Sequence, residues 1–443
     1  MRFFYSLALN LYHRLWAFIS ALWYGCPSNK MIVIGVTGTN GKSTTTYLIA
    51  KILEHCGFTT GCTSTALFKV RKKEWLNDKK MTMVGRTQLQ GLLRQMADAG
   101  CQYAVVETSS EGIKQYRHWG INYDLAVFTN LTPEHIESHG SFNAYKEAKG
   151  KLFKHLTKRP VKRLVNPMTG KLEDIPKRII ANVDDEHSDY YLGFPATEKV
   201  AYSCGGKQPT CQVNGYFGAT DIELRPDGSS FTVNEQRYEV KLPGMFNVFN
   251  ALAAISATAS LGMKTEDIAS GLMAITSMPG RMEFINQGQL FKVLVDYAPE
   301  PESLKQCYEA LKLFPHKQLI HVLGSAGGGR DKSRRPILGK MAALQADVVI
   351  VTNEDPYDED PAEIIEQVAA GAVEGGKVLG DSLLTIIDRK EALKRAFQLA
   401  GDDDLVLLTG KGCEQAICVA NGKKIPWDER TVAREVLGEL GHN

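Results

Sequence analysis

The sequence lacks several features that would place it in a specialised class of protein. None of its nine cysteines forms a C-x-x-C pair of the kind that holds zinc or a redox disulfide. The net charge is only +2, from 52 basic and 50 acidic residues, so overall charge gives no reason to expect a nucleic-acid partner. No low-complexity tract interrupts the chain. We therefore expect a soluble, globular protein of the reducing cytoplasm.

The length and the changes of pattern along the chain predict its domain organisation. A chain of 443 residues is long enough for two or three domains, each with its own core. Residues 1–30 are hydrophobic and aromatic, residues 31–280 contain a glycine-rich loop between apolar runs, and residues 281–443 alternate between strand and helix patterns. We expect an amino-terminal helical segment followed by two α/β domains with these boundaries.

The amino-terminal segment Phe3–Tyr24 is dense in aromatic and aliphatic residues. His13 and Arg14 interrupt it, and the apolar remainder is far shorter than the roughly 20 residues that a membrane-spanning helix needs. Two interpretations are open. The segment is either a helix packed on the protein, or a helix lying in a membrane interface with Arg2, His13 and Arg14 toward water.

Short apolar runs predict a buried parallel sheet. Met31–Val36 is apolar and β-branched, and it is followed by a glycine-rich turn and a helical pattern. Tyr103–Glu107 and Asp124–Asn130 are also apolar and end in polar residues, which places a site at the carboxyl ends of these strands. Residues 200–242 alternate and contain a turn, so we expect antiparallel strands there.

The glycine-rich turn is typical of a phosphate-binding loop. From Gly35 to Gly41 the spacing is one residue longer than the strict G-x-x-x-x-G-K-[ST] pattern. Backbone N–H groups of such a loop surround phosphate oxygens, Lys42 would reach the outer phosphates, and a hydroxyl of Ser43 or Thr44 would hold Mg²⁺. Because the loop follows an apolar strand and opens a helix, we expect it to bind ATP.

The loop sequence TGTNGKST resembles the ATP loop of the Mur ligases, ATP-dependent enzymes that build the peptide of cell-wall precursors. Further motifs of this family follow in its order, beginning at Glu107, Thr129, Tyr145, Asn182, Gly244, Gly280, Asp296, Gly329 and Gly410. The chain is most similar to the branch that adds the third residue of the peptide. This resemblance implies a phosphate-loop central domain with a mostly parallel sheet, followed by a Rossmann-like carboxyl-terminal ligase domain.

The resemblance also implies the reaction. Such ligases move the γ-phosphoryl group of ATP onto an acceptor carboxylate, and an amine then attacks the acyl phosphate. Both steps gather negative charge, which cations stabilise. The implied partners are ATP, Mg²⁺, a muramyl-peptide acceptor and an amino acid.

The family's motifs assign roles to individual positions. The implied catalytic residues are Lys42, Glu107, His135 and Lys149. Lys149 matches a lysine that becomes carbamylated and so gains oxygen ligands for a hard cation. The implied metal-binding residues are Ser43, Thr44, Glu107, His135 and Lys149. The implied ATP-binding residues are Gly38, Thr39, Asn40, Gly41, Lys42, Ser43, Thr44, Asn247, Asn250, Arg281, Asp296 and Lys332.

Other motif positions would hold the two substrates that are joined. Ser109, Gln115 and Arg117 match acceptor-binding positions, and the implied amino-acid-binding residues are Arg330, Asp355, Tyr357, Gly410 and Glu414. Where diaminopimelate-adding members have an arginine, this chain has Tyr357 in the acidic stretch 353–360. That stretch favours a cationic amino acid such as lysine, although a solvated acidic loop is an open alternative.

Thirty residues precede Met31, whereas this branch of the family carries a whole uridine-nucleotide-binding domain there. We therefore expect that domain to be missing, and the acceptor to be free, UDP-linked or lipid-linked. Folylpolyglutamate synthases have only the other two domains, so a γ-glutamyl ligase with a non-muramyl acceptor is the alternative enzyme. An ATP-binding subunit without catalysis is a third hypothesis, against which the intact set of implied catalytic residues speaks.

Overall fold

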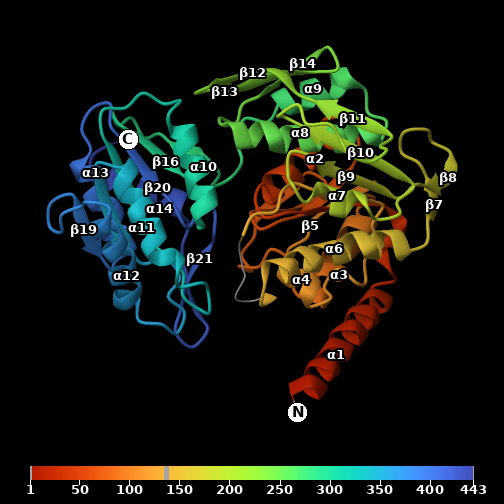
Figure 1. The fold of residues 1–443 in the computed structure, drawn as a ribbon, viewed down its shortest axis with the longest axis horizontal. Coiled ribbons are helices and arrows are strands. Elements are labelled where there is room, and N and C mark those ends of the chain that lie inside the picture. Colours follow the sequence, from red (N-terminus) through yellow and green to blue (C-terminus); the bar gives the residue numbers. More distant parts are fainter. Residues whose placement is uncertain (1, 134–138, 443) are drawn as a thin grey trace. The chain divides into compact units, whose positions relative to one another are not determined.

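The computed structural model describes residues 2–133 and 139–442, which form two compact units (Figure 1). The first unit contains residues 2–133, 139–241 and 245–276, and the second contains residues 242–244 and 277–442. His135, an implied catalytic residue, lies outside the described residues.

The first unit is built on a nine-stranded sheet of order β11-β10-β9-β6-β1-β5-β2-β3-β4. All neighbours in it pair in parallel except β2 with β3 and β3 with β4. The strands are β1 (Ile32–Thr37), β2 (Thr60–Thr63), β3 (Leu67–Val70), β4 (Lys73–Leu76), β5 (Tyr103–Glu107), β6 (Leu125–Phe128), β9 (Arg178–Asn182), β10 (Glu198–Ser203) and β11 (Gly215–Gly218). The three central strands β1, β5 and β6 are completely buried, which confirms the parallel sheet that their apolar runs predict.

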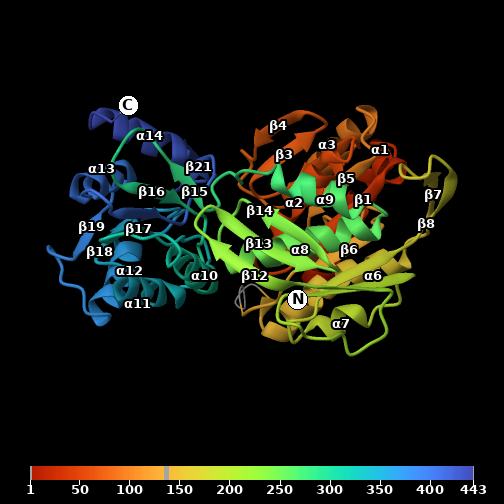
Figure 2. The same ribbon diagram turned by 90° about the horizontal axis from the view of Figure 1, so that it is seen from above.

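Helices cover both faces of this sheet (Figures 1 and 2). On one face α2 (Lys42–His55) packs against α8 (Met245–Ser260) and α9 (Thr265–Met273). On the other face α3 (Arg86–Asp98) and α6 (Phe142–Lys158) bury Leu93, Met96, Leu152 and Phe153 in one core with the strands. The short helices are η1 (Pro27–Lys30), α4 (Ser110–Lys114) and α7 (Ser188–Leu192).

The expectation of antiparallel strands over residues 200–242 is partly wrong. β10 and β11 pair in parallel and extend the main sheet, because β10 continues the parallel hydrogen bonding of β9 and buries Val200–Ser203. Only the separate three-stranded sheet of β12 (Thr220–Arg225), β13 (Gly228–Val233) and β14 (Gln236–Val240) is antiparallel. A further hairpin joins β7 (Lys162–Val165) and β8 (Leu172–Ile175).

The amino-terminal segment forms one long helix, α1 (Arg2–Trp23), which projects from the first unit (Figure 1). Its carboxyl-terminal half packs on α3 and buries Ala17, Ser20 and Ala21. Gly120 lies beneath it, and a Cβ atom there would meet the Ala17 carbonyl oxygen. Among the described helices, none is both long enough and apolar enough to cross a membrane.

The second unit contains a six-stranded sheet of order β15-β16-β20-β17-β18-β19, in which only the edge pair β15–β16 is antiparallel. Its strands are β15 (Glu283–Ile285), β16 (Lys292–Val295), β17 (Leu319–Leu323), β18 (Val348–Thr352), β19 (Leu383–Ile386) and β20 (Leu405–Leu408). Its helices are α10 (Pro301–Leu311), α11 (Arg334–Gln345), α12 (Pro361–Glu374), α13 (Arg389–Leu399) and α14 (Glu429–Glu439), and a hairpin joins β21 (Ala416–Val419) and β22 (Lys423–Pro426). The predicted second α/β region is therefore confirmed.

Candidate active site

The glycine-rich loop connects the carboxyl end of β1 to the first residue of α2. Gly41 has a φ of +79°, and a Cβ atom there would collide with the Asn250 side chain. A Cβ atom on Gly38 would collide with the Thr129 hydroxyl group. Only glycine fits both positions, and the loop backbone is therefore held close to its neighbours.

The segment that follows β6 fixes the shape of the loop. Asn40 donates its backbone N–H to Asn130 Oδ1 at 2.8 Å, and Thr129 Oγ1 donates to the Asn40 carbonyl oxygen at 2.7 Å. Thr39 donates its N–H to the Asn130 carbonyl oxygen at 2.8 Å. From the sequence, Thr129 and Asn130 are identified only as part of a family motif. Their role in supporting the loop becomes visible only in the structure.

Two lysines donate hydrogen bonds to carbonyl oxygens of the loop. Lys42 Nζ donates to the Thr39 carbonyl oxygen at 2.5 Å. Lys149 Nζ, from α6, donates to the Gly38 carbonyl oxygen at 2.6 Å and lies 4.4 Å from the centre of the Tyr145 ring. Lys149 is only 1% exposed, so it is not a solvated helix lysine. Both amines therefore lie against the backbone of the glycine-rich loop.

A buried carboxylate lies at the start of α2. Ser43 Oγ donates to Glu107 Oε2 at 2.8 Å. Thr65 also binds Glu107, through its N–H to Oε2 at 2.7 Å and through its hydroxyl to Oε1 at 3.0 Å. Of the two candidate hydroxyl residues, Ser43 contacts this carboxylate, while Thr44 is also buried. Thr65 has no motif of its own and was missed in the sequence.

Helix α8 contacts the glycine-rich loop through Asn250. Asn247 and Asn250 are both buried, and Asn250 Nδ2 donates to Asn247 Oδ1 at 3.2 Å. The structure thus brings Asn250 to Gly41, although the two lie about 200 positions apart in the sequence, and Asn247 adjoins Asn250.

The predicted acceptor-binding residues follow β5. Ser109 caps α4 by accepting the Gly112 N–H at 3.2 Å, and Gln115 and Arg117 follow the helix. Arg117 Nη2 donates to Gln115 Oε1 at 2.7 Å. Glu111 Oε1 lies 3.2 Å from His139 Nε2, and burial lowers the pKa of His139. Nothing in the sequence singled out His139.

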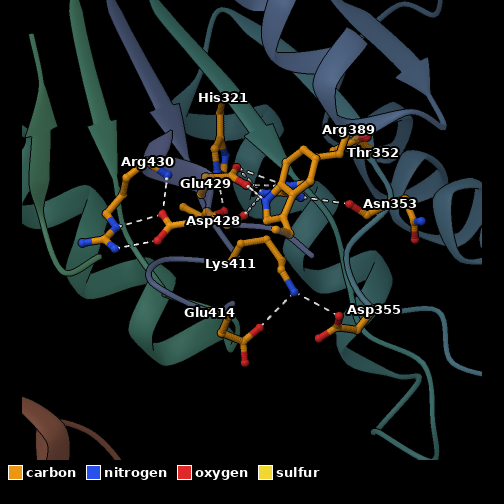
Figure 3. A network of polar contacts seen from close by, with 12 residues as sticks. His321, Thr352, Asn353, Asp355, Arg389, Lys411, Glu414, Asp428, Glu429 and Arg430 are labelled. Atoms are coloured by element: carbon orange, nitrogen blue, oxygen red, sulfur yellow. Dashed lines mark hydrogen bonds and ion pairs between the residues drawn. The ribbon is translucent and has the colours of Figure 1, made fainter. Parts of the chain in front are cut away.

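In the second unit, Lys411 lies between two carboxylates (Figure 3). Its Nζ donates to Asp355 Oδ1 at 2.9 Å and to Glu414 Oε2 at 3.0 Å, and its side chain is completely buried. Asp355 also accepts the Cys418 N–H at 2.7 Å. Two predicted amino-acid-binding residues are thus held together by a lysine that the sequence did not single out.

The other acidic residues of stretch 353–360 are also engaged. Glu354 is buried, and burial raises its pKa. Glu359 accepts from Arg335 at 3.0 Å, and Asp360 caps α12. Asp358 and Asp360 are exposed, so part of the stretch is a solvated loop, while Glu354, Asp355 and Glu359 are buried or paired with basic side chains. The preference for a cationic amino acid stays a prediction.

The remaining predicted residues of the second unit lie in several environments. Arg281 stacks on Tyr297 at 4.4 Å, and burial raises the pKa of Asp296 in spite of the Arg281 charge. Lys332 pairs with Glu359 at 2.9 Å and its side chain is 61% exposed.

Arg330 lies exposed after the glycine run 327–329. Tyr357 has a φ of +52° and its ring faces Gly328, while a Cβ atom on Gly410 would meet Glu354.

A buried ion pair supports these loops. Arg389 and Glu429 pair at 2.7 Å with almost no exposure, and Arg389 also donates to the carbonyl oxygens of Asn353 and Thr409 (Figure 3). Arg389 thereby joins the segments after β18 and β20, from which the predicted amino-acid-binding residues come.

Comparisons with known proteins cover most of the chain. Residues 36–258 match the model of the Mur ligase middle domain, and residues 280–412 match that of the Mur ligase, glutamate ligase domain. The chain is 38% identical to a UDP-N-acetylmuramyl-tripeptide synthetase of Roseiflexus sp., over 96% of this chain and 82% of that protein. It is 34% identical to a UDP-N-acetylmuramoyl-L-alanyl-D-glutamate--2,6-diaminopimelate ligase of Geobacillus thermodenitrificans, over 96% of this chain and 83% of that protein.

The chain also resembles solved structures of ligases. A structure of a UDP-N-acetylmuramoyl-L-alanyl-D-glutamate--2,6-diaminopimelate ligase matches with a TM-score of 0.59 and 30% identity, over 94% of this chain and 80% of that chain. A folylpolyglutamate synthase of Mycobacterium tuberculosis matches with a TM-score of 0.66 and 16% identity, over 97% of this chain and 95% of that chain. At 16% identity, the second likeness concerns the fold alone.

Proposed function

Because the chain belongs to the Mur ligase family of ATP-dependent, ADP-forming ligases, we propose that it joins an amino acid to the carboxylate of a muramyl-peptide acceptor. The observation that carries this proposal is the arrangement of Lys42, Lys149 and the Ser43–Glu107 pair around one glycine loop. We assign ATP binding to residues 31–280 and amino-acid binding to residues 281–443. The relatives are named for UDP-linked muramyl substrates, and we propose an acceptor of that type.

The residues of the loop would bind and orient the ATP phosphates. Backbone N–H groups of the loop would contact phosphate oxygens, and Lys42 would move from the Thr39 carbonyl oxygen to the γ-phosphate. This places positive charge where the acceptor carboxylate oxygen attacks phosphorus. The amine of the amino acid then attacks the acyl carbon, and phosphate leaves with the carboxylate oxygen.

The donor set beside the loop fits Mg²⁺. Ser43 Oγ and the Glu107 carboxylate are adjacent, buried oxygen donors, and Mg²⁺ prefers oxygen ligands. Ser43 and Glu107 would hold the ion, with a carbamylated Lys149 and His135 as the further ligands that the family's motifs imply. When bound, Mg²⁺ supplies positive charge to the phosphoryl oxygens.

For the amino acid, we propose lysine rather than diaminopimelate. Tyr357 stands where an arginine would bind a second carboxylate, and its uncharged ring faces Gly328. Asp355 and Glu414 give no preference for a cationic side chain, because Lys411 already pairs with both carboxylates. What disfavours diaminopimelate is the missing cation at position 357.

An amino-acid panel with muramyl-dipeptide acceptors tests this function. We expect ADP release that requires both acceptor and amino acid, and a product that is one lysine residue heavier by mass spectrometry. With diaminopimelate as the sole amino acid we expect a rate at least about 100-fold lower, since one charge-assisted carboxylate contact is absent. Equal rates with both amino acids would contradict the lysine assignment, and no acceptor-dependent ADP release would contradict the function.

We also propose that α1 lies on a membrane surface while the ligase works in the cytoplasm. Between residues 11 and 23, the exposed side chains of this helix are Arg14 and eight apolar or aromatic ones, namely Leu11, Tyr12, Leu15, Trp16, Phe18, Ile19, Leu22 and Trp23. Its inward face carries Ala17, Ser20 and Ala21, which is the reverse of an ordinary surface helix. No acidic residue precedes Glu54, so α1 itself carries no charge that repels anionic lipid.

Vesicle flotation tests this contact. We expect the protein to float with phosphatidylglycerol vesicles, and a variant with Leu15→Gln, Ile19→Gln and Leu22→Gln to float at least about tenfold less, since each buried side chain contributes about 1.5–3 kcal/mol. Leu290→Gln, at a 70% exposed position of the second unit, is the matched control and should float normally. The membrane contact is rejected if the triple variant floats as well as Leu290→Gln does. It is also rejected if the wild type is a dimer in solution and the triple variant is a monomer, since the apolar face would then be a contact between two copies.

A further inference from the structure

Four basic residues gather where α1 meets the first unit, and we call them the cationic cluster: His13, Arg14, Arg86 and Arg117. His13 and Arg14 come from α1, Arg86 is the first residue of α3, and Arg117 follows α4. The family's motifs account for Arg117 alone. The other three members have no role in the function proposed above.

The cluster surrounds the predicted acceptor-binding segment. Arg86 donates from Nε and Nη2 to the Gln115 carbonyl oxygen at 3.1 and 2.6 Å, and Nη2 also contacts His13 Nδ1. Arg117 donates to the side-chain oxygen of the same Gln115. Arg14 donates to the Tyr116 hydroxyl group at 2.8 Å and lies 4.6 Å from the centre of that ring. Three guanidinium groups thus contact two consecutive residues, Gln115 and Tyr116.

In the described part of the chain, the guanidinium groups of the cluster form no ion pair with a carboxylate. Within the described ranges, no carboxylate lies within 4.0 Å of the guanidinium nitrogens of Arg14, Arg86 or Arg117. The nearby Glu111 contacts His139, and its charge only partly offsets the lowering of the Arg117 pKa. Burial lowers the pKa of Arg86, and burial together with the Arg86 charge lowers the pKa of Arg117. The positive charges of Arg86 and Arg117 therefore destabilise one another, and a bound anion would offset their repulsion.

Donor groups are also left for a ligand. The hydrogen bonds of Arg86 use Nε and Nη2, and that of Arg14 uses Nη2, so Nη1 of each has no acceptor among the described residues. Guanidinium groups bind phosphate oxygens through two parallel hydrogen bonds. The cluster is half-buried at the surface, which leaves it open to a substrate group.

We propose that the cationic cluster binds a phosphate or diphosphate group of the acceptor, with α1 supplying part of the subsite. This inference rests on the proposed function, because Gln115 and Arg117 make the cluster continuous with the acceptor's peptide end. It gives α1 a role in substrate selection in addition to the proposed membrane contact. It also predicts that a phosphate-bearing acceptor is preferred to a free muramyl peptide.

The test compares two acceptors in the full chain. For Arg14→Gln and Arg86→Gln we expect the KM for UDP-linked muramyl dipeptide to rise at least about tenfold, since a charged hydrogen bond is lost. The KM for free muramyl dipeptide and for ATP should change less than about twofold. Arg163→Gln, which removes the same charge from the exposed β7–β8 hairpin, is the matched control and should change neither. If Arg86→Gln unfolds the protein, Arg14→Gln at the exposed helix carries the test.

A binding measurement separates this inference from the proposed function. With the glycine loop kept occupied by saturating ADP and Mg²⁺, titration with inorganic diphosphate should raise the melting temperature of the wild type and of Arg163→Gln, but not that of the two cluster variants. This readout needs no turnover, so it holds even if neither acceptor yields product. Equal KM increases for both acceptors would show that the arginines only position Gln115, and would overturn the proposal. Loss of vesicle flotation with unchanged KM would assign the cluster to lipid headgroups, and would overturn it too.

Discussion

Lys42→Ala is expected to lower amino-acid-dependent ADP release by roughly 10²–10³-fold, the range found when one preorganised charge-stabilising group is removed. Lys42 begins α2, and its Nζ lies 2.5 Å from the Thr39 carbonyl oxygen, over the backbone that would surround the phosphates. Removing the amine would take away the positive charge that we propose to contact the transferring phosphoryl group. Initial rates at saturating acceptor and lysine measure the effect.

The control for Lys42→Ala is Lys72→Ala, which removes an exposed lysine from the turn between β3 and β4. It should retain activity within about twofold. Both variants should melt within a few degrees of the wild type, because neither lysine is part of the apolar core. An active Lys42→Ala protein would mean that the glycine loop does not bind the ATP phosphates, and the ligase assignment would fail with it.

Lys149→Ala is expected to lose at least about 100-fold in rate and to recover part of it in acetate or formate. In the proposed carbamate, the neutral lysine amine has added to carbon dioxide with release of one proton, which turns a cation into a carboxylate-like ligand. The side chain is 1% exposed and reaches Gly38, so its removal leaves a space beside the loop that a small carboxylate could enter.

Two further variants sharpen the test of Lys149. Lys149→Arg keeps a positive charge but cannot form a carbamate, so it should be as inactive as Lys149→Ala. Lys154→Ala, at an exposed position of the same helix, should be unaffected. Full activity of Lys149→Arg, or a Lys149→Ala protein that no carboxylate rescues, would remove the carbamate from the mechanism.

Local patterns in the sequence predicted much of the first unit. The buried strands β1 and β5 are continuous apolar runs, and the loop between β1 and α2 carries its own glycine and lysine pattern, so each is set by neighbouring residues. The order of the family's motifs then linked Lys42 to Asn250, which contacts the loop from another helix.

The parts that the sequence could not predict depend on contacts between distant segments. Thr65 binds Glu107 across 42 positions, and Lys411 binds Asp355 across 56 positions. No periodicity or spacing marks such pairs, because each depends on the register of separate strands and loops. The same holds for α1, whose composition left packing and membrane contact open. The structure shows that one face packs on α3 while the opposite face is apolar and exposed.

The most direct test of the central claim follows oxygen from acceptor to phosphate. A muramyl dipeptide labelled with ¹⁸O in its reacting carboxylate is incubated with the enzyme, ATP and lysine, and the released phosphate is analysed by mass spectrometry. An acyl phosphate transfers one carboxylate oxygen to the phosphate that leaves, so we expect one ¹⁸O atom in each phosphate and one in each product amide. Unlabelled phosphate, released together with ADP, would contradict the account.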